Sequence, residues 1–244
     1  MKKILALVLA VLMVLTIAGC SNKKVDDKKS EGVMTWAEYD AAALDSEVVI
    51  ETYVQGAQSW WNDSITLYTQ DSEGGYFIYN AVCSSEMAEK LTAGQKIRVT
   101  GTKTEWAGEV EVAEGATIEV LDGFYAAEPM DATKLLGTDD LIKHQNKFVS
   151  FKGMTVEPSV DGAGNEAAYL YKWDGSGQDG DDLYFNVSLN GNTYNFTVES
   201  YLCDSSTDVY AAVKALEIGQ TVDMEGFLYW YEGVNPHITS VTVK

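Results

Sequence analysis

The chain contains a duplicated segment, and this internal repeat limits the folds that are open to it. Residues 91–110, LTAGQKIRVTGTKTEWAGEV, align without a gap with residues 216–235, LEIGQTVDMEGFLYWYEGVN, at a constant offset of 125. The identical pairs are Leu91 and Leu216, Gly94 and Gly219, Gln95 and Gln220, Gly101 and Gly226, and Gly108 and Gly233. A repeat at fixed spacing indicates that one structural unit occurs twice.

The first copy is predicted to contain five strands and one short helix. Ser84 or Ser85 is a candidate cap for a helix on which Met87 and Leu91 share a face. Alternating apolar residues bounded by turn residues predict strands over 47–56, 65–70, 76–82, 95–105 and 109–121. The helix therefore falls between the third strand and the fourth. A further short helix is predicted before this unit, because Thr35 and Glu38 fit a capping box.

The second copy has the same predicted order. Residues 190–192, NGN, are a hairpin signal between two alternating runs. A helix is predicted around Val209, Val213 and Leu216, which are spaced by four and three. The predicted strands cover residues 146–156, 183–189, 193–198, 220–230 and 237–243. The two units are joined by a segment that contains TDDLIKHQN, a possible short helix.

Five strands with a helix between the third and fourth resemble the OB-fold, a small Greek-key barrel. More narrowly, YFIY, LTAGQKIRVTGT and WAGEVEV resemble the extracellular OB-type domains of bacterial surface lipoproteins and secreted nucleases. The resemblance implies a mostly β chain with two tandem five-stranded barrels, and it leaves the ligand open. The predicted boundaries are 34–123 for the first domain, 124–146 for the linker and 147–244 for the second domain.

The N-terminus has the layout of a lipoprotein signal. Two lysines precede an apolar run that is too short to span a bilayer comfortably, and LTIAGC ends that run at Cys20. This segment resembles a lipobox, which implies cleavage after residue 19 and lipidation of Cys20. Residues 20–33 then form a polar tether. The expected location is the outer face of a bacterial membrane, anchored by lipid. An ordinary cleaved signal is the alternative.

The charge balance argues against a nucleic-acid partner. The formal net charge is -20, and from Val33 onward there are eleven basic residues, of which only Arg98 is an arginine. Proteins that bind DNA or RNA place lysines and arginines along the groove. The sequence therefore predicts that nucleic acid is a poor partner, despite the predicted fold.

Large aromatic residues fall in the loops that frame the ligand in OB-folds, which join strands one to two and four to five. These candidate ligand-binding residues are Trp60, Trp61, Trp106, Trp173, Tyr229, Trp230 and Tyr231. Flat rings of this kind stack on sugar faces with little loss of entropy. The alternative is structural, because aromatic rings also plug barrel mouths or pack one module against another. Trp60 and Trp61 are adjacent, and in a half-buried strand only one of the two could be hidden.

These features predict a non-enzymatic, lipid-anchored binding protein at the cell surface, with an extracellular glycan as the ligand. Two alternatives remain open, namely a protein-interaction module of a surface complex and an accessory for extracellular nucleic acid. A hydrolase that uses Glu109, Glu111 and Asp63 is a third, although chance pairs are expected among thirty-seven acidic residues. No catalytic residue is assigned.

An acidic loop and two cysteines complete the candidate sites. Residues 174–182, DGSGQDGDD, could bind calcium, but the spacing differs from an EF-hand and a solvated loop is the alternative. The weak metal candidates are Asp174, Asp179, Asp181 and Asp182, and no cofactor is assigned otherwise. Cys83 and Cys203 occupy equivalent places in the two units, which predicts buried free thiols rather than a disulfide.

Overall fold

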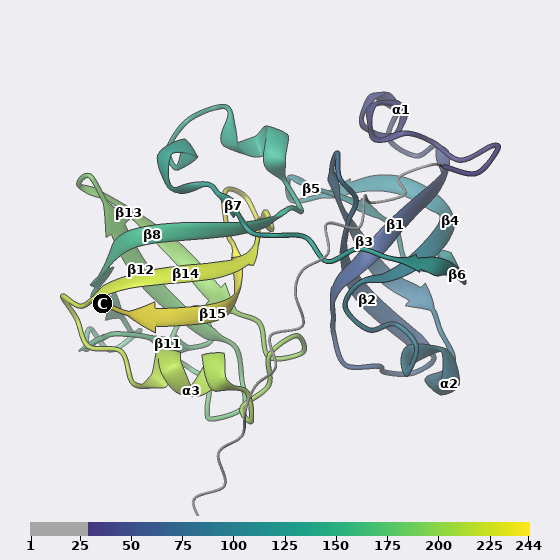
Figure 1. Cartoon of the computed structure of the whole chain (residues 1–244). Coiled ribbons are helices and arrows are strands. Elements are labelled where there is room, and N and C mark those ends of the chain that lie inside the picture. The colour runs from purple at the N-terminus through teal and green to yellow at the C-terminus, as the bar shows by residue number, and fades with distance from the viewer. Residues whose placement is uncertain (1–28) are drawn as a thin grey trace, which may run out of the picture.

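The computed structural model describes residues 29–244 and contains two β-barrels that lie side by side (Figure 1). The prediction of a mostly β chain with two five-stranded OB-like barrels is confirmed. The predicted signal peptide, Cys20 and the first part of the tether lie outside the described residues. From residue 29 onward, no helix has the length and apolar character needed to cross a membrane.

The first barrel closes through its fourth strand. β1 pairs with β2, β2 with β3, and β4 with β1, all antiparallel. The fifth strand of the barrel is split into β5 and β6, and both pieces pair with β4 and run parallel to β3. The elements are β1 (Glu47–Ala57), β2 (Ser64–Gln70), β3 (Gly75–Val82), α2 (Ser85–Ala88), β4 (Gln95–Trp106), β5 (Glu109–Val112) and β6 (Thr117–Phe124).

The split of the fifth strand differs from the single strand predicted over 109–121. A turn at residues 113–116 separates β5 from β6, and Gly115 adopts a positive φ of 84° there. Side chains at positive φ are strained, so glycine suits this position. The barrel still closes between β3 and β6, because Val82 donates its N–H to the carbonyl of Ala116 and pairs with Thr117.

The second barrel repeats this topology. β8 pairs with β12 and β14, β12 with β13, and β15 with β14 and, in parallel, with β13. The long connection between β8 and β12 carries three short strands, and β7 adds to the edge of β8. The elements are β7 (Met130–Asp131), β8 (Phe148–Glu157), β9 (Ser159–Val160), β10 (Glu166–Ala167), β11 (Leu170–Tyr171), β12 (Leu183–Leu189), β13 (Asn192–Val198), α3 (Asp208–Lys214), β14 (Thr221–Phe227) and β15 (His237–Val243).

Local sequence explains these elements. Along β12, Leu183, Phe185 and Val187 are buried and alternate with less buried residues, as expected for a strand with one face on a core. Asn190 and Gly191 both have positive φ, which is the geometry of a two-residue hairpin whose twist matches its strands. Thr207 caps α3, which buries Val209 against the second core.

The two barrels pack directly on each other. Tyr68 of β2 and Phe77 of β3 form a buried cluster with Phe227 of β14. The rings of Tyr68 and Phe227 are stacked, with centroids 4.6 Å apart. Gly56 leaves room for this packing, since a Cβ there would lie 2.8 Å from the Phe227 ring. Burial of three aromatic side chains holds the barrels in one relative orientation.

The linker contains two short 3-10 helices, η1 (Thr133–Leu135) and η2 (Leu141–His144), where the sequence predicts one short helix in TDDLIKHQN. Immediately after η2, Gln145 accepts a hydrogen bond from Val110 N–H and donates one to the Gly108 carbonyl. Asn146 donates its side-chain amide to the Val110 carbonyl and its backbone N–H to the Leu228 carbonyl. The end of the linker therefore connects β5 to the second barrel.

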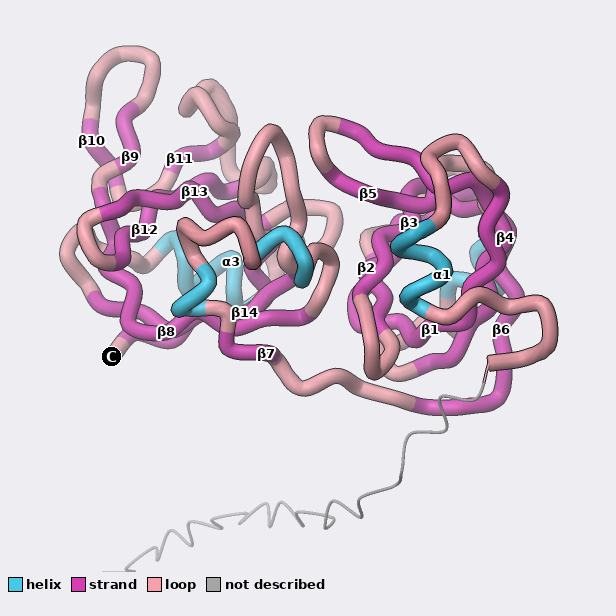
Figure 2. The backbone as a smooth tube through the Cα atoms, turned by 90° about the horizontal axis from the view of Figure 1, so that it is seen from above, coloured by secondary structure: helices cyan, strands magenta, loops and turns pink. Residues whose placement is uncertain are grey.

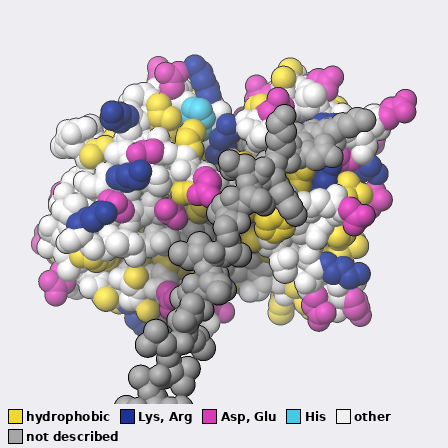
Figure 3. Space-filling view, viewed as in Figure 1, with side chains coloured by type: hydrophobic (Ala, Val, Ile, Leu, Met, Phe, Trp, Pro, Cys, Tyr) yellow, Lys and Arg dark blue, Asp and Glu magenta, His cyan; other side chains and the backbone are white. Residues whose placement is uncertain are grey.

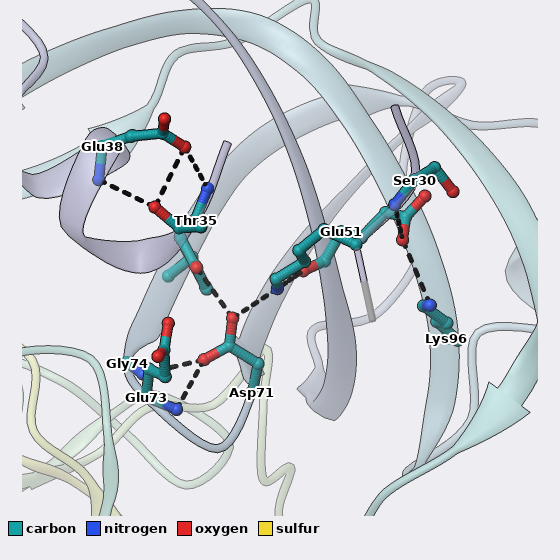
Figure 4. Close-up of polar contacts among 10 residues, drawn as sticks. Ser30, Thr35, Glu38, Glu51, Asp71, Glu73, Gly74 and Lys96 are labelled. Atoms are coloured by element: carbon teal, nitrogen blue, oxygen red, sulfur yellow. Dashed lines mark hydrogen bonds and ion pairs between the residues drawn. The ribbon is translucent and has the colours of Figure 1, made fainter. Parts of the chain in front are cut away.

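Polar groups secure the N-terminal side of the first barrel (Figure 4). The predicted capping box is present at α1 (Trp36–Ala41), where the side chains and backbone of Thr35 and Glu38 bond reciprocally. Lys29, near the end of the predicted tether, forms a 2.6 Å ion pair with the buried Asp71. The carboxylate of Asp71 also accepts the N–H groups of Glu73 and Gly74 in the adjoining turn.

Glu51 is fully buried on β1 and is the partner of two cations. Its carboxylate lies 3.1 Å from Lys96 Nζ and 2.9 Å from Arg98 Nη2. Burial by itself would raise the pKa of Glu51, but hydrogen bonds from Ser30, Lys96 and Arg98 outweigh it and lower the pKa to about 2. The folded barrel therefore stabilises the ionised form of Glu51.

This pKa predicts a loss of stability in acid. Because the folded-state value of about 2 lies below the ordinary 4.5, Glu51 stabilises the fold fully above pH 4.5, and the contribution disappears as the pH falls towards 2. We expect Glu51→Gln to lower the free energy of unfolding at pH 7 by about 1 to 2 kcal/mol and to flatten its acid dependence. Urea titrations from pH 2 to 7 measure both effects.

Glu119→Gln is the matched control, because Glu119 is the exposed partner of the same Arg98. An exposed ion pair contributes at most about 1 kcal/mol. Equal losses in the two variants would contradict the role assigned to Glu51.

Candidate ligand-binding cleft between the barrels

Two adjoining cavities form one cleft along the seam between the barrels. Their volumes are about 410 and 690 Å³, and Trp106, Glu199, Tyr229 and His237 line both. The first barrel contributes residues of β3, β4 and β5. The second contributes residues of β12, β13 and β15 and of the β11–β12 and β14–β15 connections. Cavities of this size are typical of ligand sites at domain interfaces. We refer to the two cavities together as the interbarrel cleft.

Equivalent turns of the two repeats meet at the cleft. Trp106 and Tyr231 are separated by the same offset of 125 as the repeat, and their ring centroids lie 5.1 Å apart. The residues that follow them, Ala107 and Glu232, have φ of 52° and 54°, and Glu232 N–H donates to the Ala107 carbonyl at 2.7 Å. Figure 2 shows the β4–β5 hairpin reaching from the first barrel towards the second. The duplicated turn thus makes contact with its own copy.

The floor of the cleft consists of packed rings. Tyr229 stacks on His237 with centroids 4.2 Å apart and meets the edge of Phe77 at 5.1 Å. The hydroxyl of Tyr68 lies 2.5 Å from His237 Nδ1 and accepts a hydrogen bond from Gln58. The hydroxyl proton of Tyr68 is therefore available to Nδ1. Burial lowers the pKa of His237 to about 3, so its imidazole is neutral.

Carboxyl groups of both barrels lie at the cleft. Burial raises the pKa of Glu111 on β5 to about 7, and it raises the pKa of Glu199, which follows β13, to about 7 as well. Glu199 accepts hydrogen bonds from the N–H groups of Tyr201 and Leu202. Glu109 lies deeper and accepts one from Trp230 N–H, and burial holds its pKa well above the usual range. Glu111 and Glu199 therefore each gain or lose a proton near neutral pH.

Four of the predicted aromatic residues line the interbarrel cleft, and three do not. Trp106, Trp173, Tyr229 and Tyr231 line it, and Trp106 and Trp173 are 55% and 76% exposed. Trp230 instead packs against the core of the second barrel. The rings that matter here come from three separate connections of the chain.

Trp60 and Trp61 lie outside this cleft. Trp61 is 77% exposed and lines a neighbouring cavity of about 400 Å³ together with Tyr79 and Tyr201. Trp60 is 39% exposed, and its indole N–H donates to the Cys83 carbonyl. Both rings are thus accessible, although they are adjacent. Tyr79 lines both the neighbouring cavity and the interbarrel cleft, so the two hollows adjoin.

Several cleft residues carry no sequence signal. Glu199, His237, Phe77 and Tyr184 were not predicted as site residues, and they lie on different strands or just after them. Of the carboxylates weighed together, Glu111 lines the cleft and Glu109 lies behind it, whereas Asp63 is exposed in the Trp61 turn. These groups come together only through the packing of the barrels.

The acidic loop uses its carboxylates locally. Asp174 and Asp181 accept backbone N–H groups of Ser176 and Gln178. Asp179 pairs with Lys214 at 2.6 Å, and Asp182 accepts two hydrogen bonds from Ser200. Within residues 29–244, no group of three or more histidine, cysteine or acidic side chains is arranged to hold a metal ion.

The two cysteines of the barrels are free and buried, as predicted. Cys83 follows β3 and Cys203 lies between β13 and α3, and each belongs to the core of its own barrel. Burial raises the pKa of both thiols. Each therefore acts as a small apolar side chain.

The chain resembles solved OB-type structures at low sequence identity. No protein-family model matches it, and no curated protein sequence matches it. One similar structure is the Ifi202 HINa domain in complex with double-stranded DNA, at 13% identity over 82% of this chain and 98% of that chain, with a TM-score of 0.36. A murine DNA-binding protein bound with double-stranded DNA has 11% identity over 80% and 97%, with a TM-score of 0.36. A replication protein A heterotrimer bound to single-stranded DNA has 9% identity over 84% and 51%, with a TM-score of 0.35.

These structures correct one prediction. The charge balance predicts that nucleic acid is a poor partner, whereas several of the similar structures are complexes with double-stranded or single-stranded DNA. Net charge sums over the whole chain and does not say where charges lie. On the face in Figure 3, Lys and Arg side chains are interspersed with Asp and Glu.

Proposed function

We propose that this chain is a non-enzymatic binding protein whose ligand, an extracellular glycan, lies in the interbarrel cleft. One observation carries the proposal: both barrels contribute aromatic rings to a single cleft, whose two cavities have volumes of about 410 and 690 Å³. The rings are those of Trp106 from the first barrel and of Trp173, Tyr229 and Tyr231 from the second. Aromatic faces stack on the apolar faces of sugar rings and lose little entropy on binding.

The lining of the cleft supports a ligand without phosphates. The charged residues that line it are Glu111, Glu199 and Glu232, and no lysine or arginine of residues 29–244 is among the lining residues. Phosphate groups are recognised mainly by basic side chains and backbone N–H groups. Sugar hydroxyls instead donate hydrogen bonds to acceptors such as carboxylates, which this cleft provides.

Single-stranded nucleic acid is the second candidate ligand. The exposed rings favour it as well, because bases stack on aromatic side chains in barrels of this class without sequence-specific contacts. In this case the backbone phosphates would face outward, away from Glu111 and Glu199. The two candidates differ sharply in how binding responds to salt.

A titration separates the two candidates. The full-length protein is titrated with a neutral oligosaccharide and with a single-stranded oligonucleotide, at about 50 and about 200 mM salt, and tryptophan emission is followed. A glycan-binding protein shifts its emission with the oligosaccharide equally at both salt concentrations. A nucleic-acid-binding protein responds to the oligonucleotide and loses affinity at least roughly tenfold at the higher salt. If neither this oligosaccharide nor an amino-sugar oligosaccharide causes a shift, the glycan proposal is wrong.

We also propose that the protein is anchored by lipid at Cys20 on the outer face of a bacterial membrane. The support is the sequence of residues 1–20, with its basic start, apolar run and small residues before the cysteine. We expect Cys20→Ser to abolish incorporation of a labelled fatty acid and to release the protein from the membrane fraction. Cys83→Ser should leave both unchanged. Persistent labelling of Cys20→Ser would disprove the anchor.

A further inference from the structure

Glu111 is a buried carboxyl group without a partner, and it lines the interbarrel cleft. Its side chain lies on β5 and is only 7% exposed. Within residues 29–244 it accepts no hydrogen bond and forms no ion pair, in contrast to Glu51, which is buried with two cations. An ionised carboxylate in such a place is unfavourable unless a charge of opposite sign approaches it. Because Glu111 lines the cleft, its carboxylate is available to a ligand there.

Within residues 29–244, no lysine or arginine lines the cleft beside Glu111. Glu199 lines the same cavity from the second barrel, and Tyr229 and the neutral His237 lie on its floor. The other titratable groups near the two carboxyls within residues 29–244 are Glu109, Asp182, Glu232, Cys203 and the tyrosines Tyr39, Tyr68, Tyr79 and Tyr184. All of these are acidic or neutral, so the local field favours a positive charge in the cleft.

The aromatic rings add to this preference. Trp106 and Tyr231 stand together at the rim, and Tyr229 lies below them. The face of an aromatic ring attracts a cation through its quadrupole, most strongly where water is excluded. Rings and carboxylates around one cavity are the combination that recognises ammonium groups.

We propose that the interbarrel cleft selects glycans that carry positively charged amino groups, and that the ammonium group lies against Glu111 and Glu199 while the sugar stacks on Trp106 and Tyr231. This inference rests on the proposed glycan-binding function and names the class of glycan. A partly deacetylated amino-sugar polymer has this chemistry. Ligand binding stabilises the ionised carboxylates, so it releases protons where Glu111 and Glu199 are otherwise protonated.

The test compares three hexasaccharides by calorimetry with the full-length protein. These are the neutral hexamer of N-acetylglucosamine, the glucosamine hexamer, and an N,N,N-trimethylated glucosamine hexamer whose charge does not change with pH. At pH 8 we expect the trimethylated hexamer to bind at least about tenfold more tightly than the neutral one, as cation–π and ion-pair contacts allow. The glucosamine hexamer, whose amino groups are largely unprotonated at this pH, should bind more weakly than the trimethylated one. The ratio of the affinity for the trimethylated hexamer to that for the neutral hexamer should fall towards one as the pH is lowered from 8 to 5, because Glu111 and Glu199 become protonated.

Variants assign the effect to the carboxyl groups. In Glu111→Gln and Glu199→Gln, the ratio of charged to neutral affinity should fall, and in the double variant it should be close to one at every pH. Glu166→Gln is the control, because Glu166 is an exposed acidic residue on β10 outside the cleft. It should keep the ratio of the unmodified protein. A double variant that keeps the full preference would overturn the inference.

The outcomes separate this inference from the proposed function. If the neutral hexamer binds as tightly as the trimethylated hexamer at pH 8, the selection for ammonium groups is wrong and glycan binding stands. If no hexamer binds while a single-stranded oligonucleotide does, the glycan function fails and the inference fails with it.

Discussion

Gly75→Ala should disrupt the junction of the two barrels. A Cβ at this position would lie 2.3 Å from the carbonyl carbon and 2.4 Å from the oxygen of Asn146, and 2.6 Å from the nitrogen of Lys147. These are backbone atoms of the linker, so no side-chain rotation relieves the clash. We expect a loss of about 3 kcal/mol in the free energy of unfolding, the upper end of the usual range for overpacking, together with a wider separation of the barrels.

Two measurements check this result. Urea unfolding reports the stability, and small-angle scattering reports the separation of the barrels. Gly162→Ala is the control, because a Cβ there meets only the Asp174 carbonyl oxygen, at 3.8 Å. If Gly75→Ala and Gly162→Ala unfold at the same urea concentration, the close approach of linker and β3 is not a stabilising contact.

Trp106→Ala is expected to weaken ligand binding roughly fivefold to hundredfold, since a stacked ring contributes about 1–3 kcal/mol. The ring is 55% exposed, so its removal leaves no core cavity. It also removes the contact with Tyr231 that places both rings at the rim. Trp106→Phe keeps a flat ring and should retain much of the affinity. Calorimetry with the ligand identified by titration measures the three proteins.

Trp61→Ala provides the comparison within the same protein. Trp61 is more exposed than Trp106, but it lines the neighbouring cavity with Tyr201. A loss confined to Trp106→Ala places the ligand in the interbarrel cleft. A loss confined to Trp61→Ala moves the ligand to the other cavity, and unchanged binding in both variants removes stacking as the basis of recognition.

The barrels could be predicted because their determinants are local. Leu183, Phe185 and Val187 alternate with less buried residues, and this period of two marks a strand in any context. Asn190 and Gly191 mark a hairpin for a similar reason, because few residues adopt positive φ without strain. The split between β5 and β6 was missed because the apolar alternation continues across the turn at Gly115.

The candidate rings could also be predicted, but not their grouping. The OB-type resemblance places Trp60, Trp61 and Trp106 in the loops that frame a ligand. It does not distinguish Trp106, which faces the second barrel, from Trp61, which faces a separate hollow. Trp230 lies in the predicted loop as well, but it packs against the core of its own barrel.

The sequence by itself determined the duplicated unit, the order of its strands, and the presence of aromatic residues in its loops, because alternation, turn chemistry and repeat spacing act over a few residues. Only the tertiary structure decided that Trp106 meets its counterpart Tyr231, and that Glu111 and Glu199 line one cleft. These groups are far apart along the chain, and their meeting depends on how Tyr68, Phe77 and Phe227 pack at the seam. Burial at that seam, which no local pattern encodes, also raises the pKa of both carboxyl groups.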